Sequence, residues 1–529
     1  MAYWYSVNQW RRYSIFILPL IEEGEKMYET LKKTLEKLAG DDSVLEHPAE
    51  TQEKTLLRIL KKNATTLFSK KHSLDEIGSV DAYITRMPLG KYDDFRPYIE
   101  LMKQQQEDVL VVGDFPRWVR TSGTSSSQPK LYPFTIESIE SAGQILSKLM
   151  LSVPDDESEE RVLLSGKMLM VVADVITGYI REKPVGYISG VAAHDIQDLE
   201  GLAGMISPSQ DILAMQEWET RWLEMARHAS KELITMSVST PPILLSYFKK
   251  ITSDYQSELN TPDDIRDLWP DMMLIAGAGV KMSLYEKKFR EVLGDQVRCR
   301  EFYCASEGFF AYQKDGNEGL TPVLDYIFYE FIPLEEWRSA LLKGEDYRTC
   351  QFTRLTYDQV RHNTDYIIVV TTPSGLYSYI IGDIIRFLAQ DRLVWVGRAD
   401  LESNVAGEKM NEMHMSMLKK SIETTLGVEI TNHVASVQEE PLRYVFAFEF
   451  EEEIEFDKLV NAVDRSVREA NPIYDWLREK NVLQVPDIVT LQKGTFERYF
   501  RWKQEQTGSQ GQVKPPVFVN PELIEKMKQ

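Results

Sequence analysis

A hydroxyl-rich segment between Arg120 and Lys130 is the first part of the chain whose residue types could do chemistry. Its short side chains let successive backbone N–H groups form an anion nest, and the terminal lysine adds a point charge. The segment therefore predicts a triphosphate site, with a serine-rich surface turn as the alternative. It is not a Walker A loop, because no Gly-Lys-Ser/Thr follows at the required spacing. The candidate phosphate-binding residues are Ser122, Gly123, Thr124, Ser125, Ser126, Ser127 and Lys130.

A second segment, 301–308, combines a strand-like approach with a turn of small residues that carries Glu307. A carboxylate at this position can hold Mg²⁺, which bridges phosphate oxygens. The Tyr303 ring can stack on a nucleotide base. Taken alone, the segment is more typical of a strand that ends in an exposed glutamate.

Two further segments fit a nucleoside. Asp383 follows a glycine at the end of an apolar strand, where a carboxylate can accept hydrogen bonds from both ribose hydroxyls, although a strand-to-turn aspartate is common. A run of small residues after the strand 272–275 lets the backbone approach a flat ring closely. The third glycine of a dinucleotide fingerprint is missing there, which excludes a Rossmann cofactor site. This run consists of Gly277, Ala278 and Gly279.

Composition bounds the protein class. The chain has 529 residues, which predicts two or more domains. Its 82 acidic and 61 basic residues give a net charge of −21, which disfavours nucleic acid and anionic lipid as partners. Three cysteines without a CxxC pair argue against a disulfide framework or a zinc site and favour a reducing, cytoplasmic compartment. The apolar run 15–21 is too short to cross a bilayer, and we expect it to pack on the body of the protein.

The elements that must position these residues alternate between strand-like and helix-like patterns. After helices within 22–72, including one over 50–60, the chain changes character near residue 108. Buried strands are expected at 163–173, 233–238 and 272–276, with helices at 216–229 and 284–293. Such alternation predicts an α/β domain with parallel or mixed sheets.

A second change comes at 397–400, where Gly397, Arg398 and Asp400 form an expected polar bend after a short strand. The sequence then predicts a small α+β domain. Its expected elements are a helix at 411–426 that Gly427 stops, strands at 428–438 and 443–450, a helix at 457–470, a strand at 485–491 and a helix at 495–506. We therefore expect two domains, 1–397 and 398–529.

The order of these segments resembles the adenylate-forming superfamily, which includes firefly luciferase and acyl-CoA ligases. Within it, the chain is most similar to the auxin-responsive acyl-acid amido synthetase family. The narrower resemblance rests on Met87-Pro88-Leu89, Tyr329 to Pro333, Gly494-Thr495-Phe496 and Gln512 to Pro516. The form Tyr-Ile-Ile-Gly-Asp at 379–383 also favours this family over acyl-CoA ligases.

The resemblance implies a fold and a reaction. The fold is a large N-terminal adenylate-forming α/β domain of mixed sheets with flanking helices, followed by a small mobile α+β C-terminal domain. The reaction uses ATP and Mg²⁺ to turn a small carboxylic acid into an acyl-AMP with release of pyrophosphate, and an amine, such as that of an amino acid, then takes the acyl group. The alternatives are transfer to coenzyme A and a non-catalytic nucleotide-binding scaffold.

The resemblance also implies roles for residues. The loop up to Lys130 holds the phosphates, Gly277 to Gly279 and Tyr303 border the adenine, Glu307 serves Mg²⁺, Asp383 binds ribose and Arg398 lies at the hinge. A lysine of the C-terminal domain reaches the α-phosphate, with Lys409 as the first candidate and Lys514 as the second. We expect a monomer.

Overall fold

The computed structural model divides into two compact units, described separately below. The described residues are 28–121, 129–342, 345–399, 403, 408, 410–438, 441–452, 454–479, 481–507, 516–519 and 521–528. The first unit comprises Met1–Val80, Arg96–Phe328 and Thr372–Leu376, and the second comprises Asp81–Phe95, Tyr329–Thr371 and Tyr377–Gln529. The expected α/β class with mixed sheets is confirmed. The boundary at residue 397 stays a prediction, and the apolar run 15–21 lies outside the described residues.

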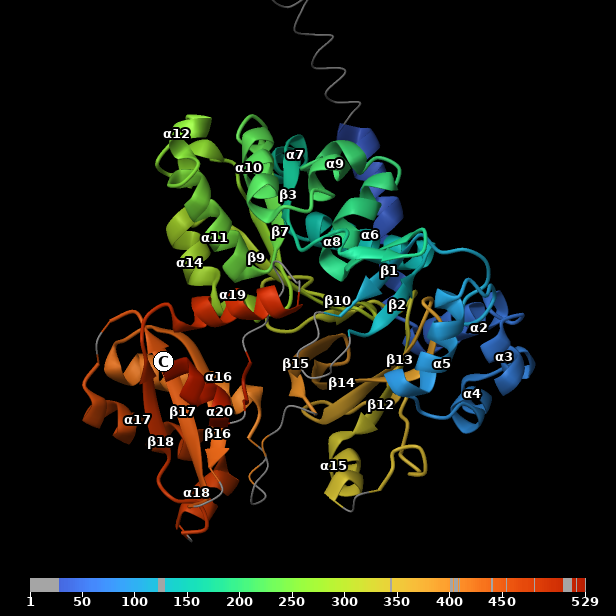
Figure 1. Ribbon diagram of the computed structural model, residues 1–529. Coiled ribbons are helices and arrows are strands. Elements are labelled where there is room, and N and C mark those ends of the chain that lie inside the picture. Colours follow the sequence, from blue (N-terminus) through green and yellow to red (C-terminus); the bar gives the residue numbers. More distant parts are fainter. Residues whose placement is uncertain are drawn as a thin grey trace, which may run out of the picture. The chain divides into compact units, whose positions relative to one another are not determined.

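The centre of the first unit is a seven-stranded sheet in the order β11-β10-β9-β8-β7-β3-β6. Its strands are β3 (Lys167–Val171), β6 (Ile206–Ser207), β7 (Ile234–Ser239), β8 (Leu274–Gly277), β9 (Arg298–Ala305), β10 (Gly308–Tyr312) and β11 (Thr321–Pro322). The five strands β6, β3, β7, β8 and β9 are parallel, and β10 returns antiparallel to β9. Parallel strands require crossover connections, and helices supply them on both faces (Figure 1).

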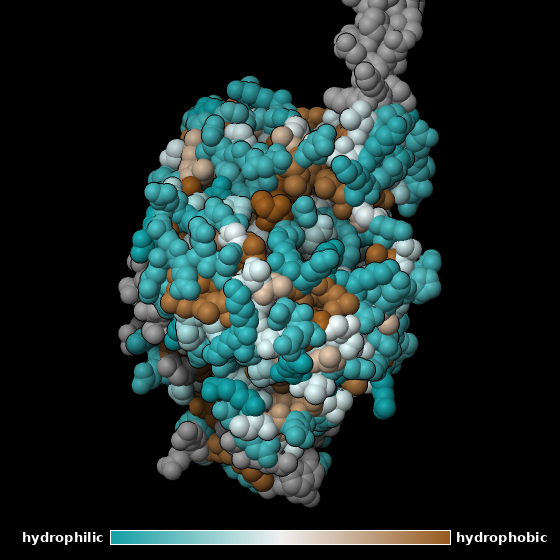
Figure 2. Space-filling view, turned by 90° about the vertical axis from the view of Figure 1, so that its right-hand side faces the viewer, coloured by the Kyte–Doolittle hydropathy of each residue, from teal (hydrophilic) through white to brown (hydrophobic). Residues whose placement is uncertain are grey.

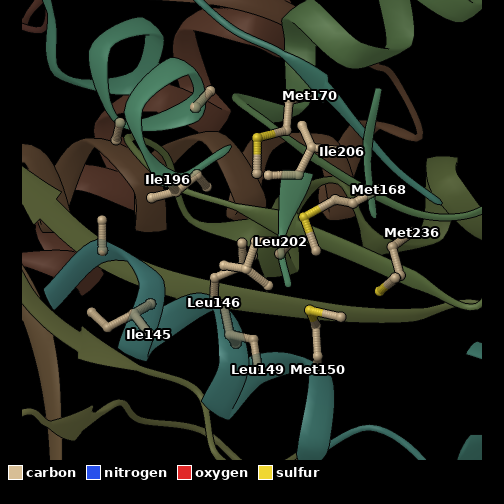
Figure 3. Packing of buried hydrophobic residues seen from close by; sticks show 14 of the residues in the cluster. Ile145, Leu146, Leu149, Met150, Met168, Met170, Ile196, Leu202, Ile206 and Met236 are labelled. Atoms are coloured by element: carbon tan, nitrogen blue, oxygen red, sulfur yellow. The ribbon is translucent and has the colours of Figure 1, made fainter. Parts of the chain in front are cut away.

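Alternate residues of β3 face different helix layers, as the pleat of a strand requires. Met168 and Met170 lie in the core that α6 (Ile136–Leu151) and α8 (Ile188–Asp195) cover, whereas Leu169 and Val171 lie in the core of the opposite face. That opposite core is covered by α10 (Trp218–Ala229), α11 (Pro241–Thr252) and α14 (Glu286–Leu293). Figure 3 shows the side chains of α6 gathered against those of β3, β6 and β7. Hydrophobic cores cover both faces of the sheet, so polar groups can gather only at the ends of its strands.

The strand expected at 163–173 was only partly correct. Its first residues belong to α7 (Glu157–Ser165), and β3 begins after Gly166. A Cβ on Gly166 would lie 2.5 Å from Thr235 Cγ2 and 2.9 Å from the Leu233 carbonyl oxygen, so the turn needs glycine. A short apolar run does not distinguish a helix end from a strand, which explains the error. The other strands and helices expected in this unit are present as β7, β8, α10 and α14.

A second sheet of the first unit has the order β2-β1-β5-β4. Its strands are β1 (Arg117–Arg120), β2 (Leu131–Phe134), β4 (Gly178–Ile180) and β5 (Lys183–Tyr187). Further helices between residues 48 and 268 are α2 (Pro48–Lys62), α3 (Leu67–His72), α4 (Val80–Arg86), α5 (Tyr92–Lys103), α9 (Gln210–Leu213), α12 (Gln256–Leu259) and α13 (Ile265–Leu268). The helix expected over 50–60 is α2. Strands β1 and β2 flank the predicted phosphate loop and therefore fix its two ends.

The second unit contains a four-stranded sheet in the order β12-β13-β14-β15. The strands are β12 (Phe328–Pro333), β13 (Asp365–Thr372), β14 (Leu376–Ala389) and β15 (Arg392–Arg398), with α15 (Leu334–Leu342) after β12. Gly397 and Arg398 pair with Ile384 and Asp383 in this sheet. The prediction that a polar bend begins at residue 397 was therefore wrong, because Gly397 and Arg398 still belong to β15. The strand continues through Arg398 because β14 offers Ile384 and Asp383 as partners at its end, despite an irregularity in the register between Ile384 and Ile385.

The rest of the second unit follows the predicted α+β order. It contains α16 (Glu412–Leu426), β16 (Ile430–Gln438), β17 (Arg443–Phe450), α17 (Phe456–Ala470), β18 (Asp487–Leu491) and α19 (Thr495–Thr507). Gly427 ends α16 with a φ of 66°, a conformation that favours glycine. Two further helices, α18 (Pro472–Glu479) and α20 (Pro521–Lys528), were not expected from the sequence.

Polar residues predominate on one face of the protein (Figure 2). Figure 2 shows hydrophilic residues over most of one face, with hydrophobic residues in small areas between them. Of the helices in the described part of the chain, none is long and apolar enough to span a bilayer.

Candidate functional site

The predicted phosphate loop has a fixed base. The Thr121 N–H donates to the Lys130 carbonyl over 3.0 Å, and the Lys130 N–H donates to Thr121 Oγ1 over 3.0 Å. The base continues into the antiparallel pair of β1 and β2, where Arg120 faces Leu131. Six predicted phosphate-binding residues lie outside the described residues, namely Ser122, Gly123, Thr124, Ser125, Ser126 and Ser127. Lys130 is described and half-buried at the end of the loop.

Glu307 lies beside this base, as a shared nucleotide site for the two segments requires. It occupies the turn between β9 and β10, and its side chain is 7% exposed. The Tyr132 hydroxyl donates to Glu307 Oε1 over 2.8 Å, and the hydroxyl of Ser306 lies 3.5 Å from the Arg120 carbonyl oxygen. Tyr132 follows Lys130 by two positions, so the loop base and the candidate metal ligand belong to one local structure.

The small-residue run lies at the same edge of the central sheet. Strands β8 and β9 are parallel neighbours, and Gly277 is in register with Glu301. The Glu301 carboxylate accepts the Met282 N–H over 2.9 Å and so holds the far end of the run; burial raises the pKa of this carboxyl group. A Cβ on Gly277 would lie 2.4 Å from the Met282 side chain, and Gly279 has a φ of 86°. The backbone conformation of Gly279 therefore favours glycine, and a Cβ on Gly277 would displace the end of the Met282 side chain.

Tyr303 lies on β9, two positions after Glu301, the last residue of β9 that pairs with β8. It is 8% exposed, and its ring centroid is 4.9 Å from that of Phe310. Gly277, Tyr303 and Glu307 thus lie at or beyond the carboxyl ends of parallel strands, where open α/β sheets bind ligands. Three of the four predicted segments come together in the first unit.

Asp383 belongs to the second unit, where its carboxylate is oriented by a neighbour. Gly382 precedes it with a φ of 90°, and the Asp383 side chain is 7% exposed. Arg398 Nη1 lies 3.4 Å from the Asp383 carboxylate, and Arg398 Nη2 donates to the Ile381 carbonyl over 3.0 Å. The carboxylate is therefore held in place by its pairing with Arg398.

Both candidate lysines, Lys409 and Lys514, lie outside the described residues. The residues next to Lys409 are anchored. Glu408 is 1% exposed and accepts the Tyr444 hydroxyl, and its own carbonyl accepts Asn471 Nδ2 over 2.6 Å. Ser403 and Met410 exchange two backbone hydrogen bonds of 2.8 Å. The chain on either side of the first candidate is thus fixed to the core of the second unit.

Sequence reasoning missed two groups of residues. Tyr132 carries no motif signal, because a tyrosine in a short strand is typical of a core residue. Glu330 is fully buried and pairs with Arg354, which also donates to the carbonyls of Ile84 and Met87 over 2.8 and 2.6 Å. A carboxylate between apolar residues, as in Tyr329 to Pro333, was the available signal for a buried partner.

Comparisons with known proteins show which family the chain belongs to. Residues 41–227 match the GH3 family N-terminal domain, residues 320–391 match its central domain and residues 412–522 match its C-terminal domain. Together these matches cover most of the chain.

Named relatives extend over nearly the same length. The jasmonoyl–L-amino acid synthetase GH3.5 of Oryza sativa subsp. japonica is 23% identical, over 89% of this chain and 92% of the relative. The indole-3-acetic acid-amido synthetase GH3.2 of Arabidopsis thaliana is 22% identical, over 74% and 81%.

Solved structures give the same fold. AtGH3.15 acyl acid amido synthetase in complex with 2,4-DB has a TM-score of 0.73 and 18% identity, over 92% of this chain and 95% of that chain. A 2-hydroxyisobutyryl-CoA ligase in the postadenylation state has a TM-score of 0.54 and 10% identity, over 96% and 92%. The expected ligase class is thereby confirmed, and the chain belongs to the GH3 family.

Proposed function

We propose that this protein is an ATP-dependent ligase that activates a carboxylic acid as an acyl-AMP and then joins the acyl group to the amine of an amino acid. The observation that carries the proposal is the grouping of the phosphate-loop base, Glu307 and Gly277 at one edge of the central sheet. The printed names of the relatives support an acid and an amino acid as the two substrates.

The residues present fit Mg²⁺ held together with ATP rather than a protein cage. Across the described ranges there is no group of three or more His, Cys, Asp or Glu residues that could hold a metal ion. Magnesium is commonly bound through one or two carboxylates plus substrate phosphates, and Glu307 supplies one such carboxylate. When bound, the metal neutralises charge on the phosphate oxygens.

The chain's own residues perform the remaining work of the first step. Lys130 and the loop before it hold the triphosphate, and Gly277 to Gly279 leave room for the flat base. Asp383 accepts the ribose hydroxyls while Arg398 orients its carboxylate. The substrate carboxylate then attacks the α-phosphorus and pyrophosphate leaves, with a lysine of the second unit opposing the charge that develops on the α-phosphoryl oxygens.

Lys409 is the preferred candidate for that lysine. Glu408 and Met410, its sequence neighbours, are both 1% exposed, so the described residues on both sides of Lys409 are buried. Lys514 remains the second candidate. In the second step the amine attacks the acyl carbon and AMP leaves.

The central test is exchange of labelled pyrophosphate into ATP with a panel of carboxylic acids, followed by product analysis with amino acids or with coenzyme A. We expect acid-dependent exchange and an amide product. The absence of exchange with every acid refutes the proposal, and a thioester as the sole product replaces it with the acyl-CoA ligase alternative.

The lysine assignment is tested by Lys409→Ala and Lys514→Ala. Lys458→Ala is the control, because the Lys458 side chain on α17 is 66% exposed. We expect Lys409→Ala to lower exchange by about 10²- to 10³-fold, as for loss of a charge-stabilising group. An equal loss in Lys514→Ala alone reverses the assignment.

We further propose a monomer in the cytoplasm. The free cysteines and the net charge of −21 fit this compartment. Light scattering and fractionation of the source cells test the two statements separately.

A further inference from the structure

Tyr132 connects two parts of the site that are far apart in sequence. Its side chain is fully buried, and its hydroxyl reaches Glu307 Oε1 at 2.8 Å across 175 positions. A tyrosine in the core usually finds a hydrogen-bond partner, and the Tyr132 hydroxyl donates to the candidate metal ligand.

The backbone of Tyr132 is fixed by the strand that ends the phosphate loop. Tyr132 pairs with Val119 in the register of β1 and β2, and Lys130 closes the loop base two positions earlier. The loop base and Tyr132 are therefore joined through one short strand, β2. The contact between Ser306 and the Arg120 carbonyl is a second tie between the same two segments.

The hydrogen bond determines which carboxylate oxygen is available. Among the described residues, Tyr132 supplies the one side-chain hydrogen bond to the Glu307 carboxylate, and this bond is made to Oε1. The bond restricts rotation of the carboxylate and leaves Oε2 for another ligand. Groups that orient a metal ligand in this way typically change metal affinity by 10- to 100-fold when they are removed.

We infer that Tyr132 is a positioning residue that orients Glu307 towards Mg²⁺ and couples metal binding to the phosphate loop. The inference rests on the proposed function, because it takes Glu307 as the ligand of the metal that accompanies ATP. Tyr132 does not touch substrate in this scheme and acts only through the carboxylate.

The test is calorimetric binding of ATP by the full chain, in the presence of Mg²⁺ and in the presence of a chelator, for Tyr132→Phe. This substitution keeps the ring that fills the core and removes the hydroxyl. We expect Mg-ATP binding to weaken by about tenfold, with no change for ATP alone.

Tyr83→Phe is the matched control. Tyr83 is also fully buried, and its hydroxyl contacts Thr371 Oγ1 at 2.7 Å in the second unit. The control loses the same atoms and a comparable hydrogen bond, so we expect it to bind Mg-ATP as the unaltered protein does. Thermal unfolding of both variants reports any shared loss of stability.

A double-mutant cycle with Glu307→Gln separates positioning from general structural damage. We expect Tyr132→Phe to have no further effect on Mg-ATP binding once Glu307 is replaced. The inference is overturned if the two effects add, if Tyr132→Phe weakens ATP binding equally without Mg²⁺, or if Tyr83→Phe matches it. If Glu307→Gln alone leaves the Mg²⁺ dependence unchanged, the metal role of Glu307 in the proposed function fails, and the inference fails with it.

Discussion

Replacement of Asp383 tests the proposed nucleotide site. Asp383 is the predicted ribose-binding residue and lies in the second unit. In Asp383→Ala the side chain that would accept the ribose hydroxyls is removed, while strands β14 and β15 keep their backbone pairing. The proposed function predicts a specific loss of ATP recognition and no change in recognition of the acid.

The size of the loss follows from the environment of the carboxylate. Asp383 is 7% exposed, so water competes poorly for its oxygens. A hydrogen bond to a charged group contributes about 1.5–3 kcal/mol, and two ribose hydroxyls therefore account for about 3–6 kcal/mol, or about 10²- to 10⁴-fold in kcat/KM for ATP. The Arg398 side chain is 35% exposed, so water can solvate it when Asp383 is removed. Loss of this ion pair therefore adds little to the loss in kcat/KM. Asp383→Asn retains one acceptor and should fall between the two proteins.

The assay is pyrophosphate exchange with ATP varied at saturating acid. Asp365→Ala is the matched control, because Asp365 forms a two-point pair with Arg386 at 2.6 and 3.0 Å on the same sheet. We expect the control to retain kcat/KM for ATP. A change of less than about fivefold in Asp383→Ala, which is near 1 kcal/mol, or an equal loss in the control, would refute the ribose assignment.

Three further predictions concern buried groups. Burial, with a smaller effect from Arg338, lowers the pKa of His414 from 6.5 to about 4. The unfolded chain therefore takes up the proton at a higher pH than the folded chain. The free energy of unfolding should fall as the pH drops from 6.5 towards 4, by at most about 3 kcal/mol. Denaturant midpoints at pH 7 and pH 5 should show this loss, and His414→Gln should reduce it without abolishing it, because burial also lowers the pKa of His433 to about 4; a flat profile in the unaltered protein contradicts it. Glu330→Gln should destabilise the second unit by about 3–5 kcal/mol, because it leaves the buried charge of Arg354 without its partner; a loss below 1 kcal/mol in urea unfolding contradicts that reasoning. Burial raises the pKa of the Cys299 thiol to about 12, so iodoacetamide at pH 8 should label it only after unfolding, and rapid labelling of the native protein would show that the strand opens.

Elements with a long, regular hydrophobic pattern were predictable. The helix α16 was bounded by Gly427 at its end, and β17 was recognised from a run of five aromatic and aliphatic residues at 444–448. The strand at 163–173 was misjudged because its apolar run continues from the end of α7 through Gly166 into β3. A short run of this kind has no period that separates helix from strand.

The phosphate loop, the turn with Glu307, the small-residue run and Asp383 were identified from residue types and order, since each is a contiguous segment that carries its own chemistry. Sequence alone therefore determined the family, the class of reaction and the candidate residues along the chain.

Only the tertiary structure decided which of these residues support one another. The bond from Tyr132 to Glu307 and the pair of Glu330 with Arg354 join side chains that no local pattern relates. Such partners are selected by the geometry of sheets that bring distant segments within hydrogen-bonding distance and exclude water from them, and a buried polar group is stable there only when its partner is in place.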